Sequence, residues 1–143
     1  MDNTNLEMMR LLERNGRSTH EELSRKLKLS RPAVHERVSK LESGKYIKGY
    51  KAVIDWKKLG QTVKTYIYLK TCGSCKAVAS ELARIRIEDT VIEECHRMAG
   101  EWCIAIKVRT TTPQHIVELL DKIREHDGVT ETYTSFVLET VFE

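Results

Sequence analysis

The spacing of apolar residues changes from a helical to a strand-like period near residue 60. Before that point they recur every three or four positions, as in Val34, Val38 and Leu41, which predicts amphipathic helices. After it, alternation of the kind seen over residues 63–70 predicts half-buried strands. The 143 residues are therefore expected to form two small modules, at 1–55 and 62–143, joined by a linker at 56–61.

The first module is expected to contain three helices, because capping residues precede each helical stretch. Ser18 and Thr19 each have a Glu three residues later, the spacing of a capping box. Ser30 is a good N-cap, and Pro32 falls in the first turn of a third helix running from about residue 31 to 43. The expected caps are Asn3 or Asn5 for the first helix, Ser18 or Thr19 for the second and Ser30 for the third.

Helix, short helix, turn and helix within about forty residues is the organisation of a helix-turn-helix. The basic, β-rich run at 46–55, centred on Gly49, predicts a small hairpin, or wing, after it. Arg37 is expected either to touch the phosphate backbone or to pair with a carboxylate inside the module. The residues expected to contact DNA are Thr19, Ser30, Arg31, Pro32, His35, Arg37, Ser39, Lys40, Lys48 and Lys51.

The charge distribution supports this interpretation. Residues 1–60 contain 14 Lys and Arg against 8 Asp and Glu, a net charge of +6, whereas residues 61–143 have a net charge of −3. A basic module attracts polyanions, and an acidic one does not. The alternative, a generic three-helix module that binds proteins, is disfavoured by the basic charge.

The second module is predicted to follow the order βαββαβ, the ferredoxin-like motif, which makes the whole chain an α+β protein. Both helices are expected to cover one face of the sheet, leaving the other face to meet a second subunit. The expected strands are 63–70, 91–98, 102–110 and 132–142, and the expected helices are 76–86 and 113–125.

Four cysteines raise a metal or redox alternative. Cys72 and Cys75 form a C-x-x-C pair, but Cys95 and Cys103 are expected to lie in strands, and no second pair completes a zinc set. We therefore expect no metal or other cofactor, and thiols that act mainly as small apolar fillers. The chain also lacks the G-x-S-x-G, H-E-x-x-H and P-loop patterns, so we do not expect an enzyme.

The N-terminus has no secretory signal pattern, and no stretch approaches about 18 consecutive apolar residues. We therefore expect a cytoplasmic, nucleoid-associated protein with no membrane partner.

Together these segments resemble the Lrp/AsnC family of transcription regulators, also called feast/famine regulators. The ordered set is specific although no single segment is decisive. The segments that carry the resemblance are Asn15-Gly16-Arg17, Glu22-Leu23, Leu29-Ser30, Glu36-Arg37-Val38, Leu41-Glu42, Ile47-Lys48-Gly49-Tyr50, Leu59-Gly60, Gly100-Glu101, Lys107-Val108, Gly128-Val129, Thr132, Thr134 and Val137-Leu138.

The resemblance implies a winged helix-turn-helix followed by an ACT-like RAM domain that forms dimers and often octamers. It also implies that a small effector, usually an amino acid, binds between RAM domains. Lys28 stands where the family usually has Gly, and Cys103 where it usually has Asp, which puts amino-acid sensing in doubt. Two alternatives are a redox or metal sensor and a ligand-free nucleoid-architectural protein. The expected effector residues are Ala99, Gly100, Glu101, Trp102, Cys103, Thr132 and Thr134.

Overall fold

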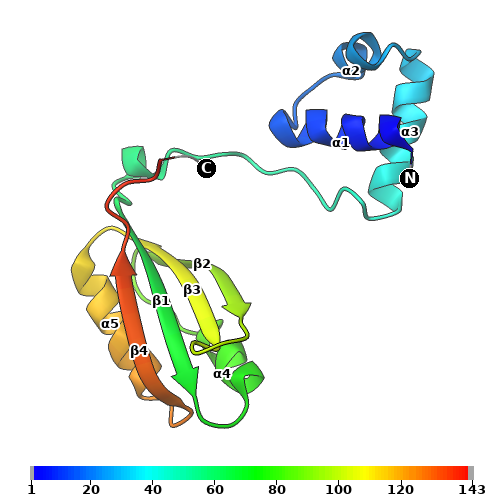
Figure 1. Ribbon diagram of the computed structural model, residues 1–143. Helices are drawn as coiled ribbons and strands as arrows, with labels where there is room; N and C mark the ends of the chain where they lie inside the picture. Colours follow the sequence, from blue (N-terminus) through cyan, green and yellow to red (C-terminus); the bar gives the residue numbers. More distant parts are fainter. Residues whose placement is uncertain (1, 142–143) are drawn as a thin grey trace. The chain divides into compact units, whose positions relative to one another are not determined.

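The computed structural model describes residues 2–141 and divides into two compact units, Met1–Ile54 and Asp55–Glu143. The first is helical and the second contains the sheet (Figure 1), which confirms the predicted α+β class.

The described part of the first unit contains the helices α1 (Asn3–Arg14), α2 (His20–Leu27) and α3 (Arg31–Ser43). Their facing sides form a core whose side chains are at most 7% exposed, and burial of each large side chain contributes about 1.5–3 kcal/mol. The core residues are Met8, Leu12, Leu23, Val34, Val38 and Leu41.

The caps agree with the sequence at α2 and α3 but not at α1. Thr19 and Glu22 form both bonds of the capping box, and Ser30 Oγ accepts a hydrogen bond from the Ala33 amide. The cap of α1 is Asp2, not Asn3 or Asn5, because its carboxylate accepts from the Asn5 amide at 2.7 Å.

The predicted wing is wrong: residues 44–55, all of which the structure describes, contain no strand. The amides of Tyr46 and Ile47 both bond to the Leu41 carbonyl at the end of α3. Further on, the Tyr50 hydroxyl donates to Glu42 at 2.9 Å, and its ring lies against Gly16. This segment is therefore fixed by contacts with the helical part of the unit. It does not form the cross-strand pairs that a hairpin needs.

The second unit confirms the predicted order βαββαβ. Within the described residues, four strands form an antiparallel sheet in the order β2-β3-β1-β4. The elements are η1 (Trp56–Leu59), β1 (Val63–Thr71), α4 (Cys75–Leu82), β2 (Thr90–Arg97), β3 (Ile104–Thr110), α5 (Pro113–Arg124) and β4 (Val129–Phe136). α4 is a turn shorter than expected, β4 is shifted towards the N-terminus, and residue 142 lies outside the described residues.

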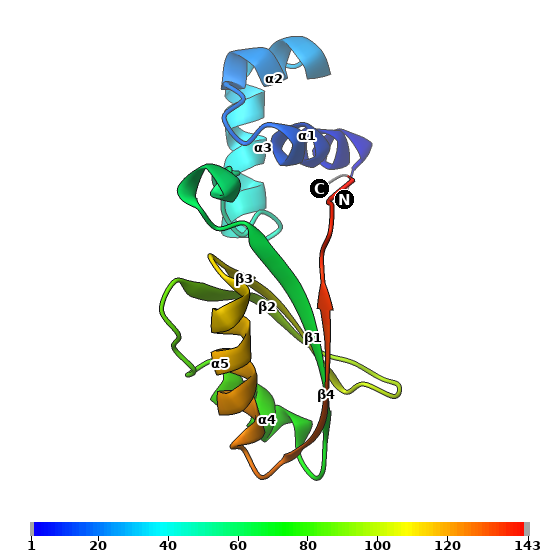
Figure 2. The same cartoon turned by 90° about the vertical axis from the view of Figure 1, so that its left-hand side faces the viewer.

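Both α4 and α5 cover the same face of the sheet, as Figure 2 shows. Buried side chains from the two helices and from β1 and β3 form one core there, and partly buried side chains of β2 and β4 pack against it. The opposite face, called here the open face, carries polar and aromatic side chains. Strand pairing assigns to the open face Tyr66, Tyr68, Lys70, Ala105, Lys107, Arg109, Glu131 and Tyr133.

Residues 56–59, which we expected to belong to a linker, form the short helix η1 at one end of this open face. The Arg109 guanidinium stacks on the Trp56 ring, 3.7 Å from its centroid, and also donates to Gln61. Its Nε donates to Glu93 at 2.7 Å, so the nearly buried Arg109 is both paired and stacked.

Candidate functional site

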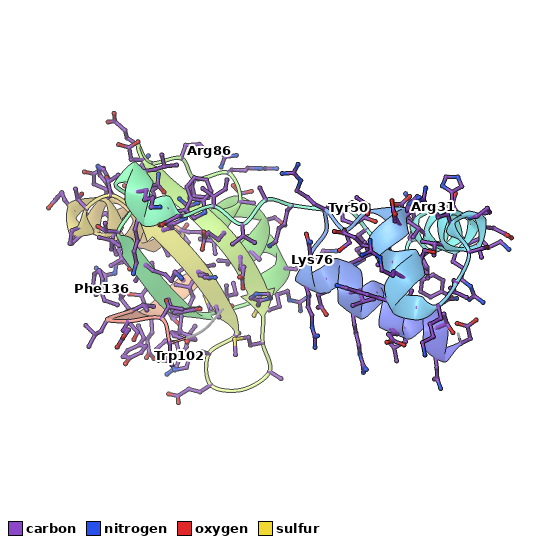
Figure 3. The ribbon with its side chains drawn as sticks, turned by 90° about the horizontal axis from the view of Figure 1, so that it is seen from above. Arg31, Tyr50, Lys76, Arg86, Trp102 and Phe136 are labelled. Carbon is purple, nitrogen blue, oxygen red and sulfur yellow. The ribbon has the colours of Figure 1, made fainter. Side chains whose placement is uncertain are left out.

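One side of α3 presents a polar stripe at helical spacing. Arg31, His35 and Ser39 follow one another at intervals of four residues, and Lys40, the residue after Ser39, lies about 100° further around the helix. All four are exposed, whereas Val34, Val38 and Leu41 turn into the core. The stripe, called here the α3 stripe, begins at the helix N-terminus with Arg31, labelled in Figure 3.

The cations of the α3 stripe are paired with exposed carboxylates. Arg31 Nη2 lies 3.0 Å from Glu21 Oε2 on α2, and Lys40 Nζ lies 2.6 Å from Glu36 Oε1. Hydrogen bonding to Lys40 lowers the pKa of Glu36 below its ordinary value. Exposed ion pairs of this kind are weak and exchange readily, so a phosphate can replace the carboxylate.

Other predicted DNA-contacting residues have roles of their own in the unit. Thr19 and Ser30 are helix caps, and Pro32 lies in the first turn of α3. Lys48 and Lys51 are exposed in the extended segment that replaces the wing.

Arg37 points into the unit. Its Nη1 donates to Asp2 at 2.7 Å and to Asn5 at 2.8 Å, which is the internal carboxylate pairing that the sequence left open. The Arg37 side chain is only 33% exposed.

The residues expected to bind an effector begin in the turn between β2 and β3. The Met98 amide bonds to the Cys103 carbonyl at 2.9 Å, and the Cys103 amide bonds to the Leu69 carbonyl at 3.0 Å. Gly100 has φ +128°, a conformation that other residues rarely adopt, and a Cβ there would meet nothing within 4 Å. Ala99, Gly100 and Glu101 are all exposed.

Trp102 belongs to an aromatic and charged cluster on the open face, beside the β2–β3 turn (Figure 3). Lys70 Nζ lies 4.8 Å from its ring centroid, and the Tyr133 ring lies 5.9 Å away. Lys70 is held between Glu131 at 3.0 Å and Glu101 at 3.1 Å, and hydrogen bonds to these two carboxylates raise its pKa. We call Lys70, Glu101, Trp102, Glu131 and Tyr133 the Lys70 cluster.

Thr132 and Thr134 are separated from this cluster by the sheet. They pair with Leu69 and Ile67, whose side chains lie on the helix-covered face. Arg124 of α5 donates to the Thr132 hydroxyl at 3.0 Å. Cys103 also turns towards the helix-covered face, where its sulfur lies 3.2 Å from the Thr71 hydroxyl. The structure therefore divides the predicted effector set between two faces.

Sequence reasoning missed Lys70, Glu131 and Tyr133. Lys70 and Glu131 are 61 positions apart and meet only because β1 pairs with β4. The alternation in β1 places Lys70 opposite the core face, but no local signal names its partner.

Within residues 2–141 no three His, Cys, Asp or Glu side chains are grouped as a metal would require. Over the same range, no helix has the length and apolarity to cross a membrane.

Two family models together match most of the chain. Residues 1–42 match the AsnC-type helix-turn-helix domain, and residues 70–143 match the Lrp/AsnC ligand binding domain.

Full-length relatives agree with these matches. The HTH-type transcriptional regulator FL11 of Pyrococcus horikoshii is 30% identical over 141 residues, which cover 98% of this chain and 91% of FL11. The solved structure of LrpC from Bacillus subtilis superposes with a TM-score of 0.85 at 28% identity, over 99% of this chain and 97% of that one.

A feast or famine regulatory protein of Mycobacterium tuberculosis, solved in complex with L-methionine, is also similar. It superposes with a TM-score of 0.87 at 28% identity, over 99% of this chain and 95% of that one.

Proposed function

The chain belongs to the Lrp/AsnC family of DNA-binding transcription regulators, and from that premise we propose that it reads DNA with the α3 stripe and responds to an amino acid bound at the Lys70 cluster. The family and the relatives are regulators and not enzymes.

The α3 stripe carries the DNA-binding part of the proposal. It offers two cations, an imidazole and one hydroxyl from an exposed helix face, and the other side of the helix packs into the core. Arg31 suits bidentate recognition of guanine, and Lys40 suits a phosphate. Their present partners, Glu21 and Glu36, are exposed and are given up at low cost. Arg37 is not among the DNA contacts, because it is bonded within the unit.

The Lys70 cluster matches the chemistry of a zwitterionic ligand. Lys70 offers a cation for an α-carboxylate, and Glu101 or Glu131 offers an anion for an α-ammonium group. The ring of Trp102 offers an apolar and cation-binding surface beside both. These carboxylates supply the negative charge that the family usually takes from an Asp at the position of Cys103. The relative solved with L-methionine supports an amino acid as the ligand class.

The open face is the surface through which two copies of the chain would associate. Tyr68 and Tyr133 pack against each other at 6.0 Å, and Tyr133 is 54% exposed in the isolated chain. A second copy pairing through this face would cover both rings and enclose the Lys70 cluster. Two-fold symmetry then predicts DNA half-sites spaced by multiples of about 10 bp.

The DNA-binding part is tested by selecting a DNA site with the full chain and measuring its affinity for variants. Arg31→Ala is expected to weaken binding to that site by about tenfold or more. Glu21→Gln is expected to strengthen it by about two- to fivefold, because it frees the Arg31 guanidinium. Arg10→Ala on α1 is the control of equal charge and is expected to behave like the unaltered chain. Equal weakening by Arg10→Ala and Arg31→Ala would refute a specific role for α3.

A further inference from the structure

The structure brings two cysteines from different elements to one hydroxyl group. Thr71 Oγ1 lies 3.1 Å from Cys75 Sγ and 3.2 Å from Cys103 Sγ. The two sulfurs are therefore separated by less than the sum of those distances. Both side chains are partly buried against the core of the second unit, and both are free thiols. The proposed DNA-binding and amino-acid-binding roles use neither thiol.

The pairing differs from the one that the C-x-x-C motif suggests. Cys72 is exposed, and its sulfur points to the Asp127 carbonyl at 3.7 Å, in the turn after α5. Between the two motif cysteines, Gly73 has φ +82° and Ser74 caps α4. The chain thus turns between them, and the Thr71 hydroxyl is shared by Cys75 and Cys103, whereas the Cys72 sulfur contacts the Asp127 carbonyl.

The surroundings of Cys75 favour its thiolate. It is the first residue of α4, where the helix dipole stabilises a negative charge. Hydrogen bonds from Thr71 and from Cys103, in that order of importance, lower the pKa of the Cys75 thiol, and the positive charge of Arg97 adds to this. For Cys95, by contrast, burial raises the pKa of the thiol.

We propose that Cys75 and Cys103 form a reversible oxidation site, at which a hydroperoxide converts the two thiols to a disulfide. The Cys75 thiolate attacks the peroxide oxygen, the O–O bond breaks, and an alcohol or water leaves as Cys75 becomes a sulfenic acid. The Cys103 sulfur then attacks Cys75, forming the S–S bond and releasing water. The two thiols lose two electrons and two protons, and the peroxide is reduced.

The disulfide ties the start of α4 to the residue that ends the β2–β3 turn. Cys103 already anchors this turn through its backbone bonds to Met98 and Leu69. The turn also carries Glu101 and Trp102, so the oxidation site lies directly behind the Lys70 cluster, on the other face of the sheet. The chemistry itself requires no DNA and no amino acid, so its test is independent of the proposed function.

The test treats the reduced full chain with hydrogen peroxide, blocks the remaining thiols by alkylation and maps the peptides without reduction. Trypsin is expected to yield residues 71–76 joined to residues 98–107, with two of the four thiols lost and both restored by dithiothreitol. Since residues 71–76 contain both Cys72 and Cys75, the same map is made for Cys72→Ser and Cys75→Ser. The link is expected to persist in Cys72→Ser and to vanish in Cys75→Ser.

Thr71 acts here as a positioning residue, which a rate measurement tests. Thr71→Val is expected to form the disulfide roughly three- to tenfold more slowly, and Thr71→Ser, which keeps the hydroxyl, at the rate of the unaltered chain. Cys95→Ser is the matched thiol control and is expected to change nothing. A main product joining Cys72 to Cys75, a disulfide between two chains, a sulfenic acid that goes no further, or four free thiols would each overturn the proposal.

Discussion

Nη1 of Arg37 donates to Oδ2 of Asp2 across 2.7 Å, joining the middle of α3 to the residue that caps α1. Asp2 uses its other carboxylate oxygen for the cap itself, since Oδ1 accepts from the Asn5 amide. One carboxylate thus starts the first helix and fastens it to the third. This arrangement gives Arg37 a role in the stability of the unit, and the proposal therefore assigns DNA contact to the α3 stripe and not to Arg37.

The two side chains are therefore expected to be coupled in stability. Arg37→Ala and Asp2→Ala each lower the free energy of unfolding, and the double variant loses less than the sum of the single losses, because either change breaks the same bond. Urea denaturation of the full chain measures this, with Arg10→Ala as the control. Strictly additive losses would show that the pair contributes nothing.

Acid is expected to weaken this contact. Arg37 and the Asn5 amide hold the pKa of Asp2 below its ordinary value of 3.8. A carboxylate with a lowered pKa contributes its full stabilisation above the unfolded-state value, and the contribution is lost as the pH falls through the folded-state value. Below about pH 4 the unaltered chain should therefore lose stability more steeply than Asp2→Asn, which has no charge to lose. Parallel urea midpoints for the two proteins over this pH range would contradict the expectation.

Lys28 adopts a left-handed conformation that suits glycine better. It ends α2 with φ +53° and ψ +42°, at the turn position where the resemblance to the family implies Gly. Lys28→Gly is expected to raise the free energy of unfolding by up to about 1 kcal/mol, because the strain at Cβ is removed. Lys26→Gly, inside the last turn of the same helix, is expected to lower it by about 1 kcal/mol. If both changes destabilise the chain, the strain at Lys28 is not the controlling factor.

Because the predicted effector residues lie on two faces of the sheet, variants on the two faces are expected to affect ligand binding differently. With L-methionine as the probe, Trp102→Ala and Lys70→Met are expected to weaken binding by about tenfold or more, because they remove the ring and the cation of the Lys70 cluster. Thr134→Val, on the helix-covered face, is the control and is expected to leave the affinity unchanged. Calorimetry on the full chain checks this; an equal loss in all three variants would place the ligand elsewhere.

The elements that local chemistry specifies were predicted from the sequence, and those that depend on distant contacts were not. The Thr19–Glu22 capping box, the Ser30 cap and the order βαββαβ follow from short-range spacing, and all are confirmed. The prediction of a wing is wrong because Tyr50 bonds to Glu42 and packs on Gly16. Strand propensity describes single residues and cannot indicate such contacts between segments.

The same difference between local spacing and distant contacts decides which parts of the candidate site could be predicted. The exposed positions of α3 follow from helical periodicity, and Arg31, His35 and Lys40 lie where the spacing predicted. The Lys70–Glu131 pair and the opposite facing of Thr132 depend on the register between β1 and β4. That register is set by the packing of the whole sheet, which the sequence of either strand alone does not reveal.

The central claim, that the α3 stripe holds the DNA, is tested most directly by the salt dependence of binding. Affinity for a selected duplex is measured at several salt concentrations for the full chain, for Arg31→Ala with Lys40→Ala, and for the control Arg10→Ala with Arg14→Ala on α1. The account predicts that the α3 double variant flattens the slope of log affinity against log salt by about one, because Lys40 is the residue assigned to a phosphate, whereas the α1 double variant leaves the slope unchanged. An unchanged slope for the α3 variant, or an equal change for both, would contradict it.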